Sequence, residues 1–182
     1  MAGIRQLLIN YEKYVRLPWE PVLAGPQKVW FAIYSPDYER QLRAQMGAFE
    51  TATLEAGHGW IQHDVTEAFP LWMAAQEYRE SYFAAPEDMD MALEDFALSV
   101  IAAVRESLQQ PGANENTVVV LSGLASLFGF MRASRLVESV APQVRGRLLV
   151  LFPGQRDGTN YKMLDARDGW NYLAIPITSE EN

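Results

Sequence analysis

The side chains best suited to acid–base chemistry in this sequence are two histidines, His58 and His63. His63 is followed directly by Asp64, and a carboxylate beside an imidazole can orient it for proton transfer. The two residues fall within one predicted strand, however, and neighbouring strand residues point to opposite faces of a sheet. His58 lies between two glycines in a predicted turn. The pattern favours structural roles for both histidines, with an enzyme acting through His63 or Asp64 as an alternative.

The motifs that activate a nucleophile or hold phosphate are incomplete. The chain has no cysteine, which excludes thiolate nucleophiles and thiolate zinc sites. A phosphate loop requires G-x-x-x-x-G-K-[ST], because closely spaced backbone amides and a lysine surround the phosphates, and the sequence contains no such string. Neither Ser122 nor Ser126 has the G-x-S-x-G setting of a nucleophile elbow, so we expect one of them to cap a helix. We therefore predict no catalytic, cofactor-binding or metal-binding residues.

The chain is acidic overall and contains one basic stretch. Asp and Glu number 23 and Lys and Arg 15, and the formal charge of −8 opposes non-specific binding to phosphate backbones. The most basic stretch contains Arg132, Arg135, Arg145 and Arg147. Arg132 and Arg135 lie three residues apart on a predicted helix and therefore share one surface. They are candidates for docking an acidic partner or a phosphate, and a solvated face is the alternative.

A second candidate docking region is the segment 164–172, which combines charges, a turn and two large aromatic residues. Asp168 and Gly169 suit the turn, but turn chemistry requires neither Arg167 nor Trp170. Tryptophan and arginine are frequent anchors of protein interfaces, while packing of Trp170 against the core is the other interpretation. The residues that the sequence nominates for partner docking are Arg132, Arg135, Arg167, Asp168 and Trp170.

The elements that must position these residues alternate between strands and helices. Continuous apolar runs bounded by turn residues predict buried strands, and apolar residues at helical spacing predict the helices between them. This alternation predicts a single α/β domain over residues 1–182, with a largely parallel sheet flanked by helices and a C-terminal hairpin-like element. The order is also like that of a P-loop NTPase core that lacks its phosphate loop. The predicted helices span residues 1–16, 38–56, 66–83, 86–109 and 124–140; the predicted strands span 29–34, 60–65, 117–121 and 147–152; the hairpin-like pair spans 161–164 and 172–175; and a frayed tail spans 178–182.

Targeting signals are missing from the sequence. Residues 1–20 are interrupted by charges and lack the apolar core of a signal peptide. No apolar run reaches the roughly 18 residues that are needed to span a membrane. Together with the absence of cysteine, these features predict a soluble cytoplasmic protein without membrane contact.

Several strings taken together resemble one protein family. They are Leu17-Pro18-Trp19-Glu20, Val29-Trp30-Phe31, Gly57-His58-Gly59-Trp60, Ser126–Phe130, Leu151–Gly154 and the long block Leu164–Ala174, followed by Pro176-Ile177. On these residues the chain resembles the BrxB family of BREX phage-defence systems, and the resemblance runs from Leu17 to Ile177. The stretch from Leu151 to Ile177, which also contains Tyr161, carries most of the specificity of the resemblance.

The resemblance implies a role in machinery that blocks phage replication and marks host DNA by adenine methylation. The companion proteins of such systems include an ATPase, BrxC, a methyltransferase, PglX, and a phosphatase-superfamily protein, PglZ. The family carries no established catalytic residues, so none can be carried over to this chain. The resemblance, together with the lack of a catalytic constellation in the sequence, predicts a non-catalytic adaptor without a cofactor, with PglZ as the first partner and BrxC and PglX as others. Two alternatives stay open: a degenerate nucleotide-binding domain, and a subunit that contacts DNA indirectly or weakly through the four arginines named above.

Overall fold

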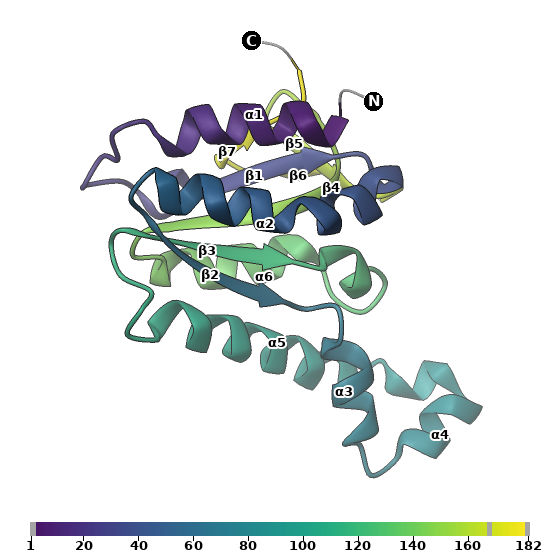
Figure 1. The fold of residues 1–182 in the computed structure, drawn as a ribbon. Helices are drawn as coiled ribbons and strands as arrows, with labels where there is room; N and C mark the ends of the chain where they lie inside the picture. The colour runs from purple at the N-terminus through teal and green to yellow at the C-terminus, as the bar shows by residue number, and fades with distance from the viewer. Residues whose placement is uncertain (1–2, 167–168, 181–182) are drawn as a thin grey trace.

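The computed structural model describes residues 3–166 and 169–180, and its centre is a parallel sheet (Figure 1). The sheet has the strand order β2-β3-β4-β1-β7, and β5 and β6 extend from β4 as an antiparallel addition. The strands are β1 (Val29–Tyr34), β2 (Gly59–Asp64), β3 (Thr117–Ser122), β4 (Arg147–Asp157), β5 (Asn160–Met163), β6 (Trp170–Asn171) and β7 (Ile175–Ile177). The α-helices are α1 (Gly3–Val15), α2 (Glu39–Glu55), α3 (Ala68–Ala74), α4 (Arg79–Ala84), α5 (Ala92–Gln109) and α6 (Ala133–Val140).

Strand β1 shows why helices cover both faces of the sheet. All of its residues are buried, as expected for a parallel strand that is covered on both sides. Phe31 and its odd-numbered neighbours pack with α5 and α6, whereas Trp30 and its even-numbered neighbours pack with α1 and α2. The predicted α/β class, with a mostly parallel sheet between helices, is confirmed. The likeness to a P-loop NTPase core stays a prediction.

Three predicted helices are interrupted in the structure. The helix predicted over 86–109 is divided into a 3-10 helix at Pro86–Met89 and α5, which begins at Ala92. The helix predicted over 66–83 is wrong as a single element, because α3 and α4 are separated by a turn. The guanidinium of Arg79 donates to the carbonyl of Ala74 and thereby satisfies the end of α3. The helix predicted over 124–140 is also wrong, since Gly129 has a φ of 85° and α6 starts only after this turn.

The C-terminal segment makes two different pairings. Strand β4 turns at Gly158, which has a φ of 59°, and pairs antiparallel with β5. β5 then pairs antiparallel with β6. The two strands of the predicted hairpin-like pair, 161–164 and 172–175, thus correspond to strands at 160–163 and 170–171. Strand β7 instead joins the main sheet parallel to β1. The amide of Asn10 donates to the Thr178 carbonyl at 2.8 Å, and residues 181–182 lie outside the described part of the chain.

We predict that Phe31→Ala lowers the free energy of unfolding by about 3–5 kcal/mol, the usual range for deleting a buried aromatic ring. Phe31 is fully buried, and its ring centre lies 5.2 Å from that of Phe152 and 4.7 Å from that of Tyr161. Urea unfolding followed by circular dichroism measures the change. Leu54→Ala is the control, because Leu54 is exposed on α2 and its loss changes stability by about 0.5 kcal/mol or less. Equal effects of the two substitutions would contradict this packing.

Candidate functional site

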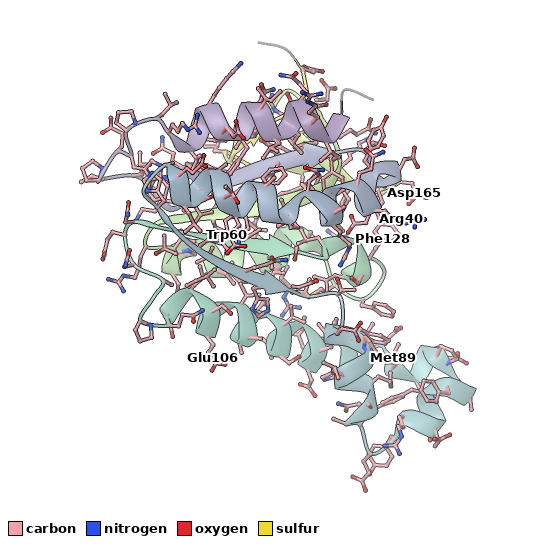
Figure 2. All side chains as sticks on the ribbon, in the orientation of Figure 1. Arg40, Trp60, Met89, Glu106, Phe128 and Asp165 are labelled. Atoms are coloured by element: carbon pink, nitrogen blue, oxygen red, sulfur yellow. The ribbon has the colours of Figure 1, made fainter. Side chains whose placement is uncertain are left out.

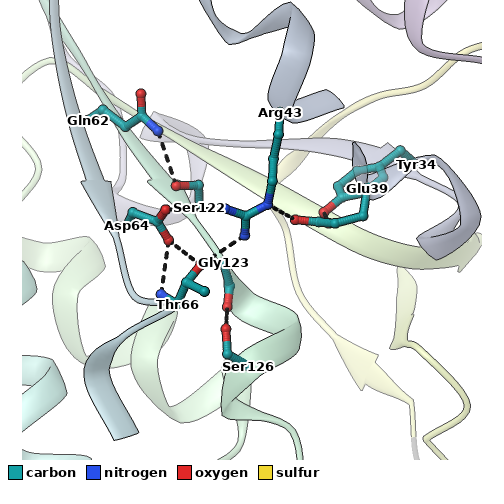
Figure 3. A network of polar contacts seen from close by, with 9 residues as sticks. All are labelled: Tyr34, Glu39, Arg43, Gln62, Asp64, Thr66, Ser122, Gly123 and Ser126. Carbon is teal, nitrogen blue, oxygen red and sulfur yellow. Dashed lines mark hydrogen bonds and ion pairs between the residues drawn. The ribbon is translucent and has the colours of Figure 1, made fainter. Parts of the chain in front are cut away.

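The carboxyl ends of the parallel strands carry a polar network, drawn in Figure 3, at the edge where α/β proteins commonly bind ligands. Arg43 of α2 reaches across this edge. Its Nε donates to Oε1 of Glu39 at 2.8 Å, and one terminal nitrogen donates to Oγ1 of Thr66 at 2.8 Å. The other terminal nitrogen lies 3.5 Å from Oδ2 of Asp64. One guanidinium thus joins α2 to the end of β2.

The turn after β3 closes the same edge. Gly123 has a φ of 84°, and a Cβ there would lie 2.4 Å from Oγ1 of Thr66, so a side chain does not fit. Ser126 donates to the Gly123 carbonyl at 2.6 Å, and Gln62 donates to Oγ of Ser122 at 3.4 Å. The expected serine cap is therefore wrong, because Gly123 holds the N-cap position of the 3-10 helix that follows. The cavity among these side chains is about 20 Å³, which leaves room for about one water molecule.

The histidine beside this network is turned away from it. Nδ1 of His63 lies 2.6 Å from Oγ of Ser107 on α5, whereas Asp64 faces Arg43 and α2. Burial lowers the pKa of His63 more than the Asp64 charge raises it. Burial opposes the ionisation of Asp64 too, but hydrogen bonds from Thr66 and the charge of Arg43 outweigh burial and lower the pKa of Asp64. The prediction that His63 and Asp64 point to opposite faces is confirmed.

A second feature is a pocket of about 460 Å³ between the start of α6 and the strands β5 and β6. We call it the Trp170 pocket. Aromatic and methionine side chains form its walls, and Arg132 and Ser134 supply polar groups. The apolar residues that line it include Phe128, Phe130, Phe152, Tyr161, Met163 and Trp170. Apolar walls with a few polar groups are typical of sites that bind a ligand or the side chains of a partner.

Trp170 is half-buried and belongs to both the core and the pocket. Its ring centre lies 5.4 Å from that of Phe31 and 4.7 Å from that of Tyr172, on which it stacks. Its Nε1 donates to Oε1 of Glu138 on α6 at 2.7 Å. Packing of Trp170 against the core is therefore confirmed, and the packed ring forms one wall of the pocket.

Arg132 and Arg135 share one surface at the start of α6, as predicted. Arg132 is exposed at the Trp170 pocket and makes no ion pair with the residues that the structure describes. Arg135 forms a bidentate pair with Glu94 of α5, at 2.7 and 2.5 Å. The other two nominated residues, Arg167 and Asp168, lie outside the described residues. Arg132 is thus the nominated cation that is placed to meet a partner at the pocket.

The four arginines of the basic stretch do not form one face. Arg145 and Arg147 lie at the start of β4, at the opposite end of the sheet from Arg132. Arg145 pairs with Glu115 at 2.6 Å. Arg147 is buried, with its guanidinium carbon 4.7 Å from the ring centre of Trp19. The structure therefore does not bring the four arginines together into one basic patch, and contact with DNA stays a prediction.

Phe128 and Phe130 are candidate functional residues that the sequence interpretation missed. Phe128 is 41% exposed, and the ring of Phe130 stacks on that of Phe69 at 3.7 Å. A helix over 124–140 would have placed both phenylalanines on a regular helical surface. The turn at Gly129 instead brings them both to the pocket. The Phe-Gly-Phe spacing is the sequence signal that could have identified this turn.

We predict that Asp64→Asn removes stability at neutral pH and that this difference shrinks in acid. A carboxylate whose pKa is lower in the folded state stabilises the fold above its unfolded pKa of about 4. That contribution is lost as the pH falls through the lowered, folded pKa of Asp64. Urea unfolding at neutral pH and below about pH 4 measures it, with Glu50→Gln on the exposed side of α2 as the control. A difference that stays constant with pH would contradict the role assigned to Asp64.

Residues 73–177, more than half of the chain, match the family described as BREX protein BrxB. No curated protein and no solved structure matches the chain. The matched range contains the Trp170 pocket, whereas the strings Leu17–Glu20 and Gly57–Trp60 lie outside it. Within the described residues, no helix has the length and apolar character required to cross a membrane. The predicted resemblance is confirmed, and the chain belongs to the BrxB family, as a component of a BREX phage-defence system.

Proposed function

We propose that this chain is a non-catalytic adaptor that docks PglZ to other BREX components, with the Trp170 pocket as its contact for PglZ. The observation that carries the proposal is an apolar pocket of about 460 Å³ with an exposed arginine beside it, inside the range that matches the family. Membership in the family supports other BREX components as partners. PglZ is the first candidate because the resemblance to BrxB implies it as a companion.

The pocket suits a particular kind of partner surface. Phe128 and Trp170 offer aromatic walls to an apolar side chain, whose burial contributes roughly 1.5–3 kcal/mol. Arg132 can pair bidentately with a carboxylate that lies next to that side chain. Interfaces draw most of their binding energy from a few aromatic and arginine residues of this kind. We therefore expect PglZ to present an apolar side chain with an acidic neighbour.

The walls of the pocket are fixed by contacts within this chain. Trp170 is held by Glu138 and Tyr172, and the pocket residues Phe152 and Tyr161 are buried in the core. Side chains that are already ordered lose less conformational entropy when a partner binds. This preorganisation supports a docking role for the pocket.

The non-catalytic part of the proposal is supported by the carboxyl edge of the sheet. His63 and Asp64 turn to opposite faces, which prevents their direct pairing. Arg43 and the turn at Gly123 fill the place where a substrate of an α/β enzyme would bind. A closed edge of this kind supports a structural use of these polar residues.

We predict that Phe128→Asp and Arg132→Glu each raise the dissociation constant for PglZ at least about tenfold. The first substitution places a charge in the apolar pocket, and the second sets like charges against each other at its rim. Co-purification of tagged chain with PglZ, followed by interferometry with purified proteins, measures the effect. The matched controls Leu54→Asp and Arg40→Glu lie on exposed positions of α2 and should bind PglZ as the wild type does.

The possible results separate the two parts of the proposal. A wild-type chain that retains neither PglZ nor any other BREX component would disprove the adaptor role. Retention of PglZ by the wild type and equally by both pocket variants would leave the adaptor role standing and disprove the pocket as the contact.

We also predict that calorimetric titration with ATP gives no heat of binding, because the cavity at the carboxyl edge holds about one water molecule. Saturable heat with ATP would favour the degenerate nucleotide-binding alternative.

For the same chain, we expect the electrophoretic mobility of DNA to be unchanged at low salt, because Arg135 and Arg145 are paired and Arg147 is buried. A DNA shift that weakens steeply with salt would favour the DNA-contacting alternative.

A further inference from the structure

One segment projects from the sheet and has almost no core of its own. Residues 67–91, which we call the acidic arm, contain α3, α4 and a 3-10 helix at Pro86–Met89. Figure 1 shows α4 beyond the helices that flank the sheet. Figure 2 shows side chains that spread outward from this part of the chain, near the labelled Met89. Met73 is buried, but no side chain from residue 74 to residue 91 is.

Large apolar side chains nevertheless lie on the surface of the arm. Leu71, Tyr78 and Phe83 expose 67%, 63% and 63% of their surface, and Met91 exposes 90%. Four large exposed apolar side chains within one short projecting segment make this segment a candidate site of interaction.

Phe69, Trp72 and Met73 of α3 pack against the core or are buried, but residues 74–91 bury no side chain. Ordering residues 74–91 costs backbone entropy, and burial within them offsets little of that loss. A partner that covered the exposed apolar side chains of the arm would supply the missing apolar burial.

The arm also carries most of the excess negative charge of the chain. It contains six carboxylates and one arginine, a net charge of −5 against −8 for the whole chain. The one cation, Arg79, lies 3.9 Å from Glu80 and also bonds the end of α3. The arm therefore repels phosphate backbones and attracts a basic surface. Its carboxylates are Glu67, Glu77, Glu80, Glu87, Asp88 and Asp90.

We propose that the acidic arm docks into an apolar groove edged by lysine and arginine on a partner protein. Short helices that insert apolar side chains into a groove are a recurrent mode of protein recognition. The carboxylates around those side chains meet the basic edge, which speeds association and fixes orientation. Phe69 at the start of the arm stacks on the pocket residue Phe130, but no residue of the arm lines the Trp170 pocket. The inference does not depend on what occupies that pocket.

A second copy of this chain is a poorer fit as the occupant. The groove must offer several available cations, but in the basic stretch Arg135 is paired with Glu94, Arg145 with Glu115, and Arg147 is buried. Two copies that each carry a charge of −8 also repel each other. The occupant is therefore a different protein, one with a basic surface.

The test uses the full chain and purified PglZ, BrxC and PglX, each measured separately by interferometry. The arm variants are Phe83→Asp, and Glu80→Lys combined with Glu87→Lys. The matched controls on α2 are Leu54→Asp and Glu50→Lys. All of the substituted side chains are exposed, so the variants should keep their fold, which circular dichroism and the melting temperature check.

We expect one companion to bind with a dissociation constant that rises at least about tenfold in both arm variants and stays unchanged in both controls. Binding of that companion to the wild type should weaken as salt is raised. The pocket variant Phe128→Asp is run in parallel, so that failure of the pocket and failure of the arm are distinguishable.

Three results overturn the inference. The first is a wild-type chain that binds none of the three companions. The second is a dissociation constant for every companion that is the same in the wild type and in both arm variants. This result overturns the inference even if Phe128→Asp weakens the binding of a companion. The third is an arm substitution that alters only self-association in sedimentation experiments, because the occupant would then be a second copy.

Discussion

Burial of β1 on both faces is the constraint on which the rest of the structure depends. On one face Phe31 packs against Phe152 and Tyr161, which brings the C-terminal strands onto the sheet. On the other face Trp30 contacts Tyr11 edge-on, which holds the first helix. The two ends of the chain are therefore fixed by the two sides of one strand. The wall of the candidate site formed by Trp170 depends on the same strand, since its ring packs on Phe31.

At the carboxyl edge of the sheet, polar residues in a position that often binds ligands bond to one another within the chain. Parallel strands end there in a row of polar groups that a ligand satisfies in many enzymes. In this chain Arg43 satisfies the carboxylates of Glu39 and Asp64, and Gly123 lets the next turn approach closely. The edge is closed by the chain itself. This closed edge leaves other surfaces for a partner. The pocket beside α6 and the acidic arm both expose large apolar side chains.

The sequence predicted the parts of the fold that local patterns determine. The strand over 29–34 was predicted with the bounds observed, because a short continuous apolar run between turn residues is typical of a buried strand. Pairing of β7 with β1 was not predicted, since it joins segments far apart in the chain. At the candidate site, Arg132 and Trp170 were nominated because their residue types stand out in this context. Phe128 was missed because its position depends on the turn at Gly129, which the helical interpretation concealed.

The two surfaces differ in shape and in charge, and this difference bears on whether a second copy of the chain could occupy either of them. The pocket is a recess with Arg132 beside it, and the arm is a projection with a net charge of −5. Opposite charges on two surfaces of one chain would favour head-to-tail association, which does not close on itself. The pair between Glu94 and Arg135 removes a second cation from the surface beside the pocket. Among the described residues that line the pocket, the arm of another copy would meet one arginine, Arg132, while the two acidic chains repel each other.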